Sequence, residues 1–348
     1  MNSDMKVLSI IIPAYNSAAF LDKGVSSLLH DEMLEKLDII IVNDGSSDET
    51  AAIAQKYCDR YPDSIRLISQ ENRGHGGALN TGCNAAVGKY LKVIDADDWV
   101  VTDNLPEFVA RLENCDSDVV LTHYRTIDIT TGEVKNWKSY PPEFDRNYTL
   151  DEIMPQWKNF DRSLTFHGIA YKTSFYREKG IRLSEKVFYE DNEFATFPCC
   201  HAESILPLDL FIYVYRIGDV EQSVSDENQL KRLSHTETVL ARMISEYQKL
   251  TLPENHLGRE YVARKTQGVT MSYLTTVMLV EPDKKLGREK AAKMMDLFYR
   301  ELPAVFEGVR RKYQIYRLLN RLHVTKAAFE KVLHSDLYNK IRNNHDFN

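Results

Sequence analysis

The sequence YLKVI at residues 90–94 runs directly into DADD at residues 95–98, and this stretch decides the fold class. Its first five residues predict a buried strand, and the acidic turn follows at the carboxyl end of that strand. Similar apolar runs, separated by helical patterns at 18–29, 50–61 and 78–87, lie at 7–12, 37–42 and 65–68. Strands that alternate with helices and lack a polar face predict a Rossmann-like α/β fold, in which helices cover both faces of a mostly parallel sheet.

The pattern changes along the rest of the chain. From about residue 118 the sequence is β-rich and irregular, and an apolar strand is expected at 208–215. After Gly218, long helical patterns follow at 228–250, 258–280, 284–300 and 305–341. We therefore predict an α/β domain over residues 1–220 and a helical domain over residues 221–348. The role of the second domain is open between acceptor binding, oligomerisation and contact with a membrane surface.

Composition and charge narrow the class of protein. The chain has 348 residues, with 44 Lys and Arg against 51 Asp and Glu, which gives a formal net charge of −7. This balance argues against a protein that coats nucleic acid, because phosphate neutralisation needs a clustered basic surface. Its five cysteines form no CxxC pair, and no apolar run approaches the ~20 residues that a membrane-spanning helix needs. These features predict a cytoplasmic protein.

Four polar loops follow the four predicted parallel strands, at residues 13–16, 43–48, 70–77 and 95–99. In an open parallel sheet, ligands bind beyond the carboxyl ends of the strands, so these loops are expected to share one edge. Together they carry acids, an arginine, glycines and aromatic rings, a set that suits a nucleotide diphosphate and a divalent metal ion.

The acidic turn is the most informative of these loops. Asp95, Asp97 and Asp98 lie within four residues, and their carboxylates repel one another unless a cation is present. Mg²⁺ or Mn²⁺ relieves that repulsion and can bridge to substrate phosphates. The alternative is a solvated acidic turn in which one aspartate caps the following helix.

Two other patterns each have two interpretations. The sequence GHGG at residues 74–77 could bring backbone N–H groups close to a phosphate, or it could form a flexible turn before a helix. Glu190 and Asp191 could supply a general base, or they could cap a helix whose dipole favours negative charge. The chain has neither GxGxxG after its first strand nor a P-loop, which argues against a dinucleotide-binding protein and a P-loop NTPase.

Taken together, these loops resemble those of the family 2 glycosyltransferases of the GT-A fold. Five elements in the same order carry the resemblance, which covers about residues 6–200: they are residues 9–16, 41–48, 72–82, 95–98 and 190–191. The resemblance implies an inverting, nucleotide-sugar-dependent enzyme that uses Mn²⁺ or Mg²⁺. It says nothing about the chain after residue 220.

The resemblance also implies roles for individual residues. The implied contacts with the nucleotide-sugar are made by Pro13, Ala14, Tyr15, Asn16, Asp44, Arg73, Gly74, Gly76, Gly77, Asn80, Asp95 and Ala96. Within that set, Asp44 would accept a hydrogen bond from the base, usually uracil. Asp97 would ligate the metal, with Asp95 on the ribose or metal side. Asp191 would be the catalytic base, with Glu190 beside it.

The sequence departs from the family pattern near Asn80. Leu79 stands where many relatives have an arginine, so a diphosphate contact is missing or comes from elsewhere, with Arg216 as a candidate. No histidine clearly completes the metal shell, for which His167 and His201 are candidates.

The predicted reaction moves a sugar from a UDP-sugar to a hydroxyl of a glycan or glycoconjugate acceptor, lipid-linked acceptors included, by metal-assisted inverting displacement. One alternative is a sugar nucleotidyltransferase, although the glycine- and basic-rich signature expected after the first strand is absent. The other is a non-catalytic protein that binds sugar nucleotides or glycans, which would not need the carboxylates of Glu190 and Asp191.

The C-terminal part of the chain is basic. From residue 310 onward, nine Lys and Arg stand against three Asp and Glu, interleaved with Tyr313, Ile315, Tyr316, Leu318 and Leu319. A solvated helix face above a core stripe is the favoured interpretation. The alternative is a peripheral contact with the inner face of the membrane, and a homo-oligomer is also left open.

Overall fold

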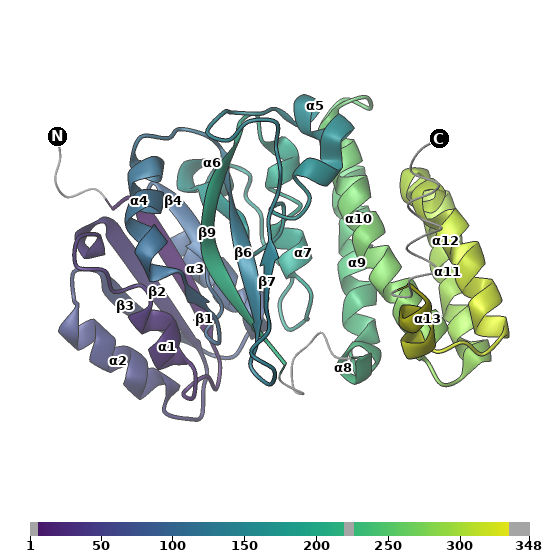
Figure 1. Ribbon diagram of the computed structural model, residues 1–348, viewed down its shortest axis with the longest axis horizontal. Helices are drawn as coiled ribbons and strands as arrows, with labels where there is room; N and C mark the ends of the chain where they lie inside the picture. The colour runs from purple at the N-terminus through teal and green to yellow at the C-terminus, as the bar shows by residue number, and fades with distance from the viewer. Residues whose placement is uncertain (1–5, 219–225, 334–348) are drawn as a thin grey trace. The chain divides into compact units, whose positions relative to one another are not determined.

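The computed structural model describes residues 6–218 and 226–333 of the chain (Figure 1). The chain forms two compact units, one comprising residues 1–222 and 251–262 and the other residues 223–250 and 263–348. Residues 251–262 thus group with the first unit, although the sequence analysis placed them in the helical domain. The predicted boundary at residue 220 falls outside the described residues.

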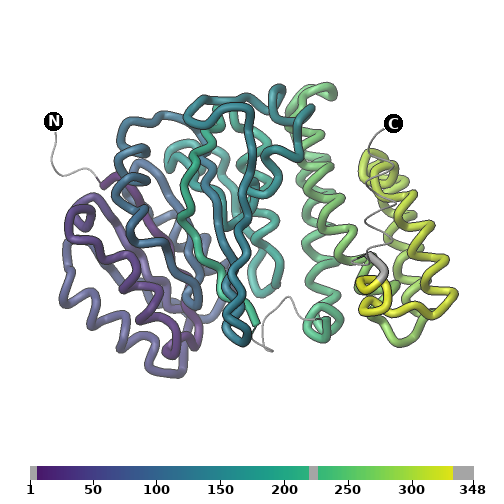
Figure 2. Tube along the Cα trace, in the orientation of Figure 1, coloured from purple at the N-terminus to yellow at the C-terminus, as the bar shows by residue number. Residues whose placement is uncertain are grey.

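The first unit is built on a mixed sheet of nine strands. These are β1 (Leu8–Ala14), β2 (Leu37–Asp44), β3 (Ile65–Gln70), β4 (Tyr90–Val93), β5 (Trp99–Val100), β6 (Val119–Asp128), β7 (Val134–Trp137), β8 (Ile169–Lys172) and β9 (Ile205–Ile217). Their order is β3-β2-β1-β4-β8-β6-β9-β5, and β7 pairs with β6. Figure 2 shows the course of the chain as a tube coloured by residue number.

The first four strands form the parallel part of the sheet. β1 and β2 are buried along their whole length because helices cover both faces. Side chains alternate between the faces: Ile10 and Ile12 join a cluster with Leu21 of α1 (Leu21–Ser26). Ile11 points the other way, toward α3 (Gly74–Ala85), where a Cβ at Gly82 would lie 2.3 Å from Ile11 Cγ2. Alternating strands and helices thus place the predicted loops on one edge.

The second half of the sheet has mixed strand directions. β8 pairs antiparallel with both β4 and β6, and β5 and β7 are also antiparallel to their neighbours, whereas β6 and β9 are parallel. The α/β fold is as predicted, but beyond the first four strands the only parallel pair among the described residues is β6 with β9. The expected strand at 208–215 is the core of β9, which inserts beside β6 and reaches the turn after β4.

The remaining elements of the first unit are short, apart from two helices that cover the sheet. They are α2 (Thr50–Arg60), α4 (Leu105–Glu113), α5 (Leu150–Ile153), α6 (Thr173–Glu178), α7 (Asp191–Phe194) and the 3-10 turns η1 (Leu34–Lys36), η2 (Thr102–Asn104), η3 (Met154–Asn159) and η4 (Cys199–His201).

The second unit is helical. Its helices are α8 (Asp226–Lys231), α9 (Leu233–Lys249), the larger part of α10 (Leu257–Thr275), the π-turn η5 (Thr276–Val280), α11 (Lys284–Glu301), α12 (Pro303–Arg321) and α13 (Lys326–Leu333). The helical pattern at 305–341 is expected to contain breaks, and one lies after Arg321, where His323 adopts a φ of 56°. The part of that prediction beyond residue 333 lies outside the described residues. No helix among the described residues is both long and apolar enough to cross a membrane.

Candidate active site

The turn after β4 places its three aspartates in different surroundings. Asp98 is buried, and its carboxylate accepts hydrogen bonds from the Tyr213 hydroxyl at 2.5 Å and from the backbone N–H of Arg216 at 2.7 Å. Burial, together with the charges of Asp97 and Asp95, raises the pKa of Asp98 well above its ordinary value. Asp98 therefore anchors the turn to β9 and has no free face for a ligand.

Asp97 is the aspartate of this turn that faces outward. Its side chain is 36% exposed, and its nearest cationic neighbour is the guanidinium of Arg216, with Nη1 3.9 Å from Oδ2. Burial and the nearby charge of Asp95 raise the pKa of Asp97 to about 6. The carboxylate thus lies in a field of excess negative charge, which a bound cation would relieve.

Through His75, Asp95 links the acidic turn to Glu190, which precedes the predicted base Asp191. His75, near the N-terminus of α3, has Nε2 at 2.8 Å from Asp95 Oδ1 and Nδ1 at 2.5 Å from Glu190 Oε1. Burial lowers the pKa of His75, but the two carboxylates outweigh it and raise the pKa well above its usual value. The imidazolium can then donate to both carboxylates, and the same charge holds the pKa of Asp95 below its usual value against the effect of burial.

Asp191 begins α7, directly after Glu190. Glu190 is buried, and at this helix start its side chain makes no capping hydrogen bond, so the capping interpretation finds no support there. Burial and then the charge of Glu190 raise the pKa of Asp191 to about 6. Its Oδ1 accepts a hydrogen bond from the Asn192 side chain at 3.0 Å. Glu190 is committed to His75, which makes Asp191 the carboxylate of the pair suited to take a proton.

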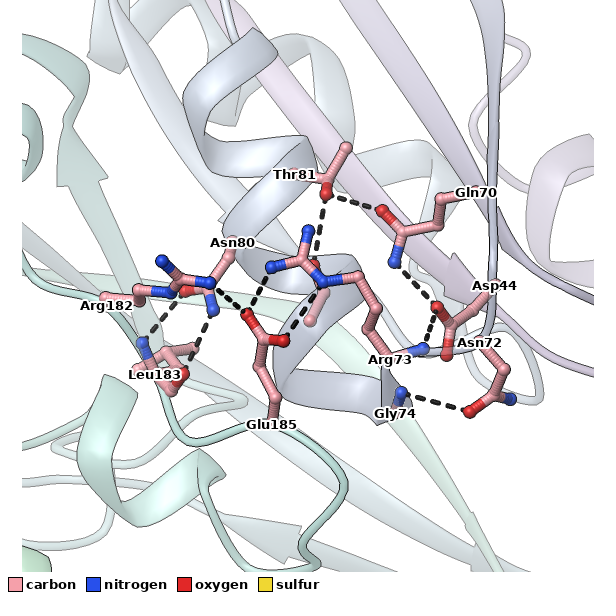
Figure 3. A network of polar contacts seen from close by, with 11 residues as sticks. Asp44, Gln70, Asn72, Arg73, Gly74, Asn80, Thr81, Arg182, Leu183 and Glu185 are labelled. Atoms are coloured by element: carbon pink, nitrogen blue, oxygen red, sulfur yellow. Dashed lines mark hydrogen bonds and ion pairs between the residues drawn. The ribbon is translucent and has the colours of Figure 1, made fainter.

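Asp44 ends β2 and belongs to the polar network in Figure 3. Its Oδ1 accepts hydrogen bonds from Gln70 Nε2 at 2.6 Å and from the Arg73 backbone N–H at 2.9 Å. Its Oδ2 is buried without any hydrogen-bond partner. A buried carboxylate oxygen without a donor is costly, and a ring N–H of a bound base would satisfy it.

The loop after β1 is held against the loop after β2. Asn16 Oδ1 accepts a hydrogen bond from the Ser47 N–H at 2.8 Å, and the Asn16 N–H donates to Ser46 Oγ at 3.0 Å. Pro13 and Ala14 are buried, whereas Tyr15 is 53% exposed and presents its ring at the surface. The side-chain amide of Asn16 is therefore used to join two loops.

The glycines of residues 74–77 pack against the chain at residues 184–190. A Cβ at Gly76 would lie 2.1 Å from the Ser184 carbonyl oxygen and 2.9 Å from Glu190 Cγ. Gly74 has a φ of +75°, and a Cβ there would lie 2.8 Å from the Lys186 nitrogen. The absence of side chains thus allows close packing next to Glu190. Whether the same backbone also contacts a phosphate stays a prediction, as it does for Gly77.

Arg73 and Asn80 both contact the chain at residues 182–190, which we call the crossing segment. The Arg73 guanidinium pairs with Glu185, with Nε 3.0 Å from Oε2, and Arg182 contacts that carboxylate at 2.9 Å (Figure 3). The Asn80 side chain donates to the Leu183 carbonyl at 3.0 Å and accepts from the Leu183 N–H at 2.8 Å. Asn80 therefore uses both ends of its amide to fix this segment.

The departures from the family pattern can now be placed. Leu79 is fully buried in α3, whereas Arg216 lies beside Asp97, with its guanidinium 4.4 Å from the centre of the Phe20 ring. His167 packs between Tyr213 and Tyr215 at ring distances of 4.8 and 4.7 Å, and burial lowers its pKa to about 4. His201 lies in η4, and burial together with the charges of Lys179 and His256 lowers its pKa.

Sequence reasoning assigned no role to three residues that shape this site: His75, Gln70 and Tyr213. A lone histidine between glycines has no local signal, because its partners are 20 and 115 residues away along the chain. Gln70 ends β3 and Tyr213 lies in β9, and the register of these strands could not be predicted. The only usable signal was position, since both His75 and Gln70 belong to the polar stretch at residues 70–77 that was predicted at the binding edge.

The link through His75 predicts a measurable coupling in stability. Replacing His75 with glutamine should lower the free energy of unfolding by about 1–3 kcal/mol, because the buried Glu190 carboxylate loses its positively charged donor. The double variant H75Q/E190Q should recover most of this loss, since no buried charge then lacks a partner. Urea unfolding of the four proteins of this cycle gives the coupling energy, and strictly additive effects would contradict the link.

Comparisons with known proteins agree with this geometry. Residues 9–176, which include the strands from β1 to β8, match Glycosyl transferase family 2. The chain is 27% identical to the uncharacterized glycosyltransferase EpsJ of Bacillus subtilis (strain 168) over 259 residues, covering 72% of this chain and 71% of that protein. It is 37% identical to the uncharacterized glycosyltransferase YibD of Escherichia coli (strain K12) over 143 residues, 41% of this chain and 40% of that protein.

Solved structures show the same fold. The S. aureus TarS structure in complex with UDP-GlcNAc superposes with a TM-score of 0.59 at 19% identity, covering 91% of this chain and 92% of that one. The mannosyltransferase PcManGT from Pyrobaculum calidifontis, in complex with GDP-Man and Mn²⁺, gives a TM-score of 0.51 at 16% identity, covering 91% and 87%. These likenesses identify the architecture as GT-A, with a helical region that follows it in the chain.

Acids at the binding edge of a GT-A fold suit a nucleotide-sugar donor. Residues 9–176 match the family 2 glycosyltransferases, the relatives reported above are named glycosyltransferases, and the chain is an enzyme of this class. The predicted family and enzyme class are thereby confirmed, and the comparisons favour them over a nucleotidyltransferase or a non-catalytic binding protein.

Proposed function

We propose that this enzyme transfers a sugar from a UDP-sugar to a hydroxyl group of a glycan or glycoconjugate acceptor, with inversion at the anomeric carbon. One observation carries the proposal. His75 brings the acidic turn at Asp95 and the carboxylate pair at Glu190 into one site, although they are separated by almost a hundred residues of chain. Leaving-group stabilisation and proton removal can therefore act on the same pair of substrates.

The residues of the acidic turn fit a divalent metal ion. No three His, Cys, Asp or Glu side chains within residues 6–218 and 226–333 converge to hold a metal by themselves. Mg²⁺ typically uses only one or two protein carboxylates and takes its other ligands from substrate phosphates and water. Asp97 supplies an exposed oxygen ligand, and Asp95 is its neighbour. Mn²⁺ or Mg²⁺ bound there would neutralise the charge that develops on the departing diphosphate.

Asp191 is assigned the proton-accepting step. Displacement by an acceptor hydroxyl requires removal of its proton as the bond to the anomeric carbon forms, and a carboxylate at the reaction centre can accept it. Asp191 is ionised at neutral pH, because its pKa is raised only to about 6. A direct displacement with one base inverts the configuration. Glu190 and His75 act as positioning residues that hold Asp191 beside the acidic turn.

The choice of UDP rests on Asp44. Its unpartnered Oδ2 can accept the N3–H of uracil, whereas cytosine has no hydrogen at N3. The TarS structure has UDP-GlcNAc bound, whereas PcManGT has GDP-Man, so the family fold alone does not decide the base.

Binding measurements on Asp44→Asn test this choice. We expect wild-type protein with Mn²⁺ to bind UDP about 10- to 100-fold more tightly than CDP, the range of one charge-assisted hydrogen bond. The variant should lose most of that preference. Asp59→Asn removes an exposed carboxylate on α2 and should leave the preference unchanged. Equal affinities of the wild type for UDP and CDP would contradict the assignment of Asp44.

The proposed reaction is tested by screening UDP-, GDP- and CDP-sugars for metal-dependent hydrolysis, which needs no known acceptor. We expect a UDP-sugar to be cleaved to UDP and free sugar by the wild type with Mn²⁺, and not after chelation. Release of pyrophosphate or formation of a new nucleotide bond would instead indicate a nucleotidyltransferase, and cleavage of only GDP- or CDP-sugars would refute the UDP assignment.

A further inference from the structure

Helix α12 carries apolar residues on two sides, and in the described part of the chain only one of these sides is buried. Val305 and Val309 are buried on the inner face. Ile315, Leu318 and Leu322 are 49%, 59% and 65% exposed. Ile315 and Leu318 are three residues apart on α12, and Leu322 caps its C-terminal end, so the three lie together on a side that the buried valines do not occupy. The expectation that the apolar residues of this segment form a core stripe is therefore wrong for Ile315 and Leu318.

The exposed apolar stripe lies among basic side chains. Five cations on α12 are exposed, with Glu307 as the only acidic residue of the helix; they are Arg310, Arg311, Lys312, Arg317 and Arg321. Two are engaged locally, since Arg310 pairs with Glu307 at 2.8 Å and the Arg317 guanidinium lies 5.6 Å from the centre of the Tyr313 ring. The helix is thus positive in a chain whose formal net charge is −7.

We propose that α12 docks on an anionic lipid surface, with Ile315, Leu318 and Leu322 entering the boundary between headgroups and acyl chains. Helices that lie in this boundary combine an apolar stripe with flanking Lys and Arg. The long basic side chains lay their stems along the apolar layer and place their charges at the lipid phosphates. Each cation close to an anionic leaflet adds to the attraction. The proposal does not depend on the identity of the sugar donor or acceptor.

A second copy of the chain is a less suitable occupant. In a two-fold dimer the same patch meets itself, so the basic flanks of one α12 would face those of the other. Three aliphatic side chains on one helix also fall short of the roughly 1,200 Å² that a specific protein interface buries. A fluid bilayer needs neither a matched shape nor a larger area. Charge and size together therefore favour a lipid surface.

Flotation of the full-length protein with vesicles tests the proposal. Vesicles of phosphatidylcholine with phosphatidylglycerol should carry the protein, and those of phosphatidylcholine alone should not. Binding to the anionic vesicles should fall at least tenfold between low salt and 0.5 M NaCl, because salt screens exposed charges. If the protein does not float with anionic vesicles at low salt, the proposal is overturned, whatever the enzyme's sugar donor proves to be.

Two double variants, each with a matched control, separate the apolar from the electrostatic contribution to vesicle binding. Ile315→Ser with Leu318→Ser should weaken binding about tenfold or more, whereas Val87→Ser with Ile129→Ser removes exposed apolar side chains elsewhere and should have no effect. Arg311→Glu with Lys312→Glu should weaken it likewise, whereas Lys285→Glu with Lys293→Glu on α11 makes the same charge change and should weaken it much less.

The outcomes have distinct meanings. Equal losses in a test variant and its control would show that binding does not depend on the position of the changed residues, and they would refute docking through α12. Sedimentation of the unliganded protein as a dimer that I315S/L318S converts to a monomer would identify a second copy as the occupant and would also refute the lipid proposal. Unchanged melting temperatures of the variants show that the loss of binding is not a loss of folding.

Discussion

Replacing Asp97 with asparagine is expected to lower turnover by about a thousandfold or more and to abolish the effect of Mn²⁺ on UDP affinity. The variant keeps the shape of the side chain but removes the charge that makes it a metal ligand. A metal ion contributes several kcal/mol to stabilising the charge that develops on the leaving group, and each 1.36 kcal/mol is a factor of ten in rate. Steady-state hydrolysis of the UDP-sugar and calorimetry with UDP, each with and without Mn²⁺, measure both effects.

Two controls make this result specific. Asp103→Asn removes an exposed carboxylate on η2 and should leave turnover and the Mn²⁺ effect unchanged. The pKa of Asp97 is raised to about 6, so protons compete with the metal below that value, and the apparent affinity for Mn²⁺ should fall as the pH drops from 7 to 5. Full activity of D97N in the presence of a chelator would show that Asp97 holds no catalytic metal.

The parallel half of the fold could be read from the sequence because its signals are local. The runs predicted at 37–42 and 90–94 correspond to β2 (Leu37–Asp44) and β4 (Tyr90–Val93). A strand buried on both faces is uniformly apolar, and this pattern does not depend on its partners. The loops that follow such strands share an edge by topology alone, which explains why the acidic turn was placed correctly beside the other loops.

Apart from the strand expected at 208–215, the second half of the sheet and its pairing escaped prediction because its strands are defined by their neighbours. β5 has two residues and β8 has four, which is too short for a periodic signal. β9 inserts between β6 and β5 although the chain between β6 and β9 is long, and no property of its sequence encodes that position. Strand propensity describes a fit to a half-buried surface, so such strands become visible only in the assembled sheet.

The glycine motif at residues 74–77 indicated where these residues lie but not why they have to be glycines. They lie at the binding edge, as expected, and α3 begins at Gly74. Their lack of side chains is explained by the crossing segment, since Ser184 and Glu190 occupy the space that a side chain at Gly76 would need. A contact between positions about a hundred residues apart leaves no local trace, and the same reason hid the role of His75.

Replacing Asp191 with asparagine is expected to lower turnover by roughly 10²- to 10⁴-fold while leaving UDP affinity nearly unchanged. This is the usual contribution of a positioned general base. Asp44 and the acidic turn, which are assigned to the nucleotide and the metal, are not altered. A loss in turnover without a loss in donor binding indicates an interaction made in the transition state. Asp116→Asn removes an exposed carboxylate from the same unit and serves as the matched control.

The pH dependence distinguishes this role from a structural one. Burial and the charge of Glu190 raise the pKa of Asp191 to about 6, so the carboxylate becomes protonated and unable to accept a proton as the pH falls through that value. With saturating Mn²⁺, wild-type turnover should be level above about pH 7 and should fall about tenfold per pH unit well below 6. D191N should lose this acid limb, because the group that titrates is gone. If Asp191 served only to begin α7, the variant would instead melt at a lower temperature and would keep both its turnover and the acid limb.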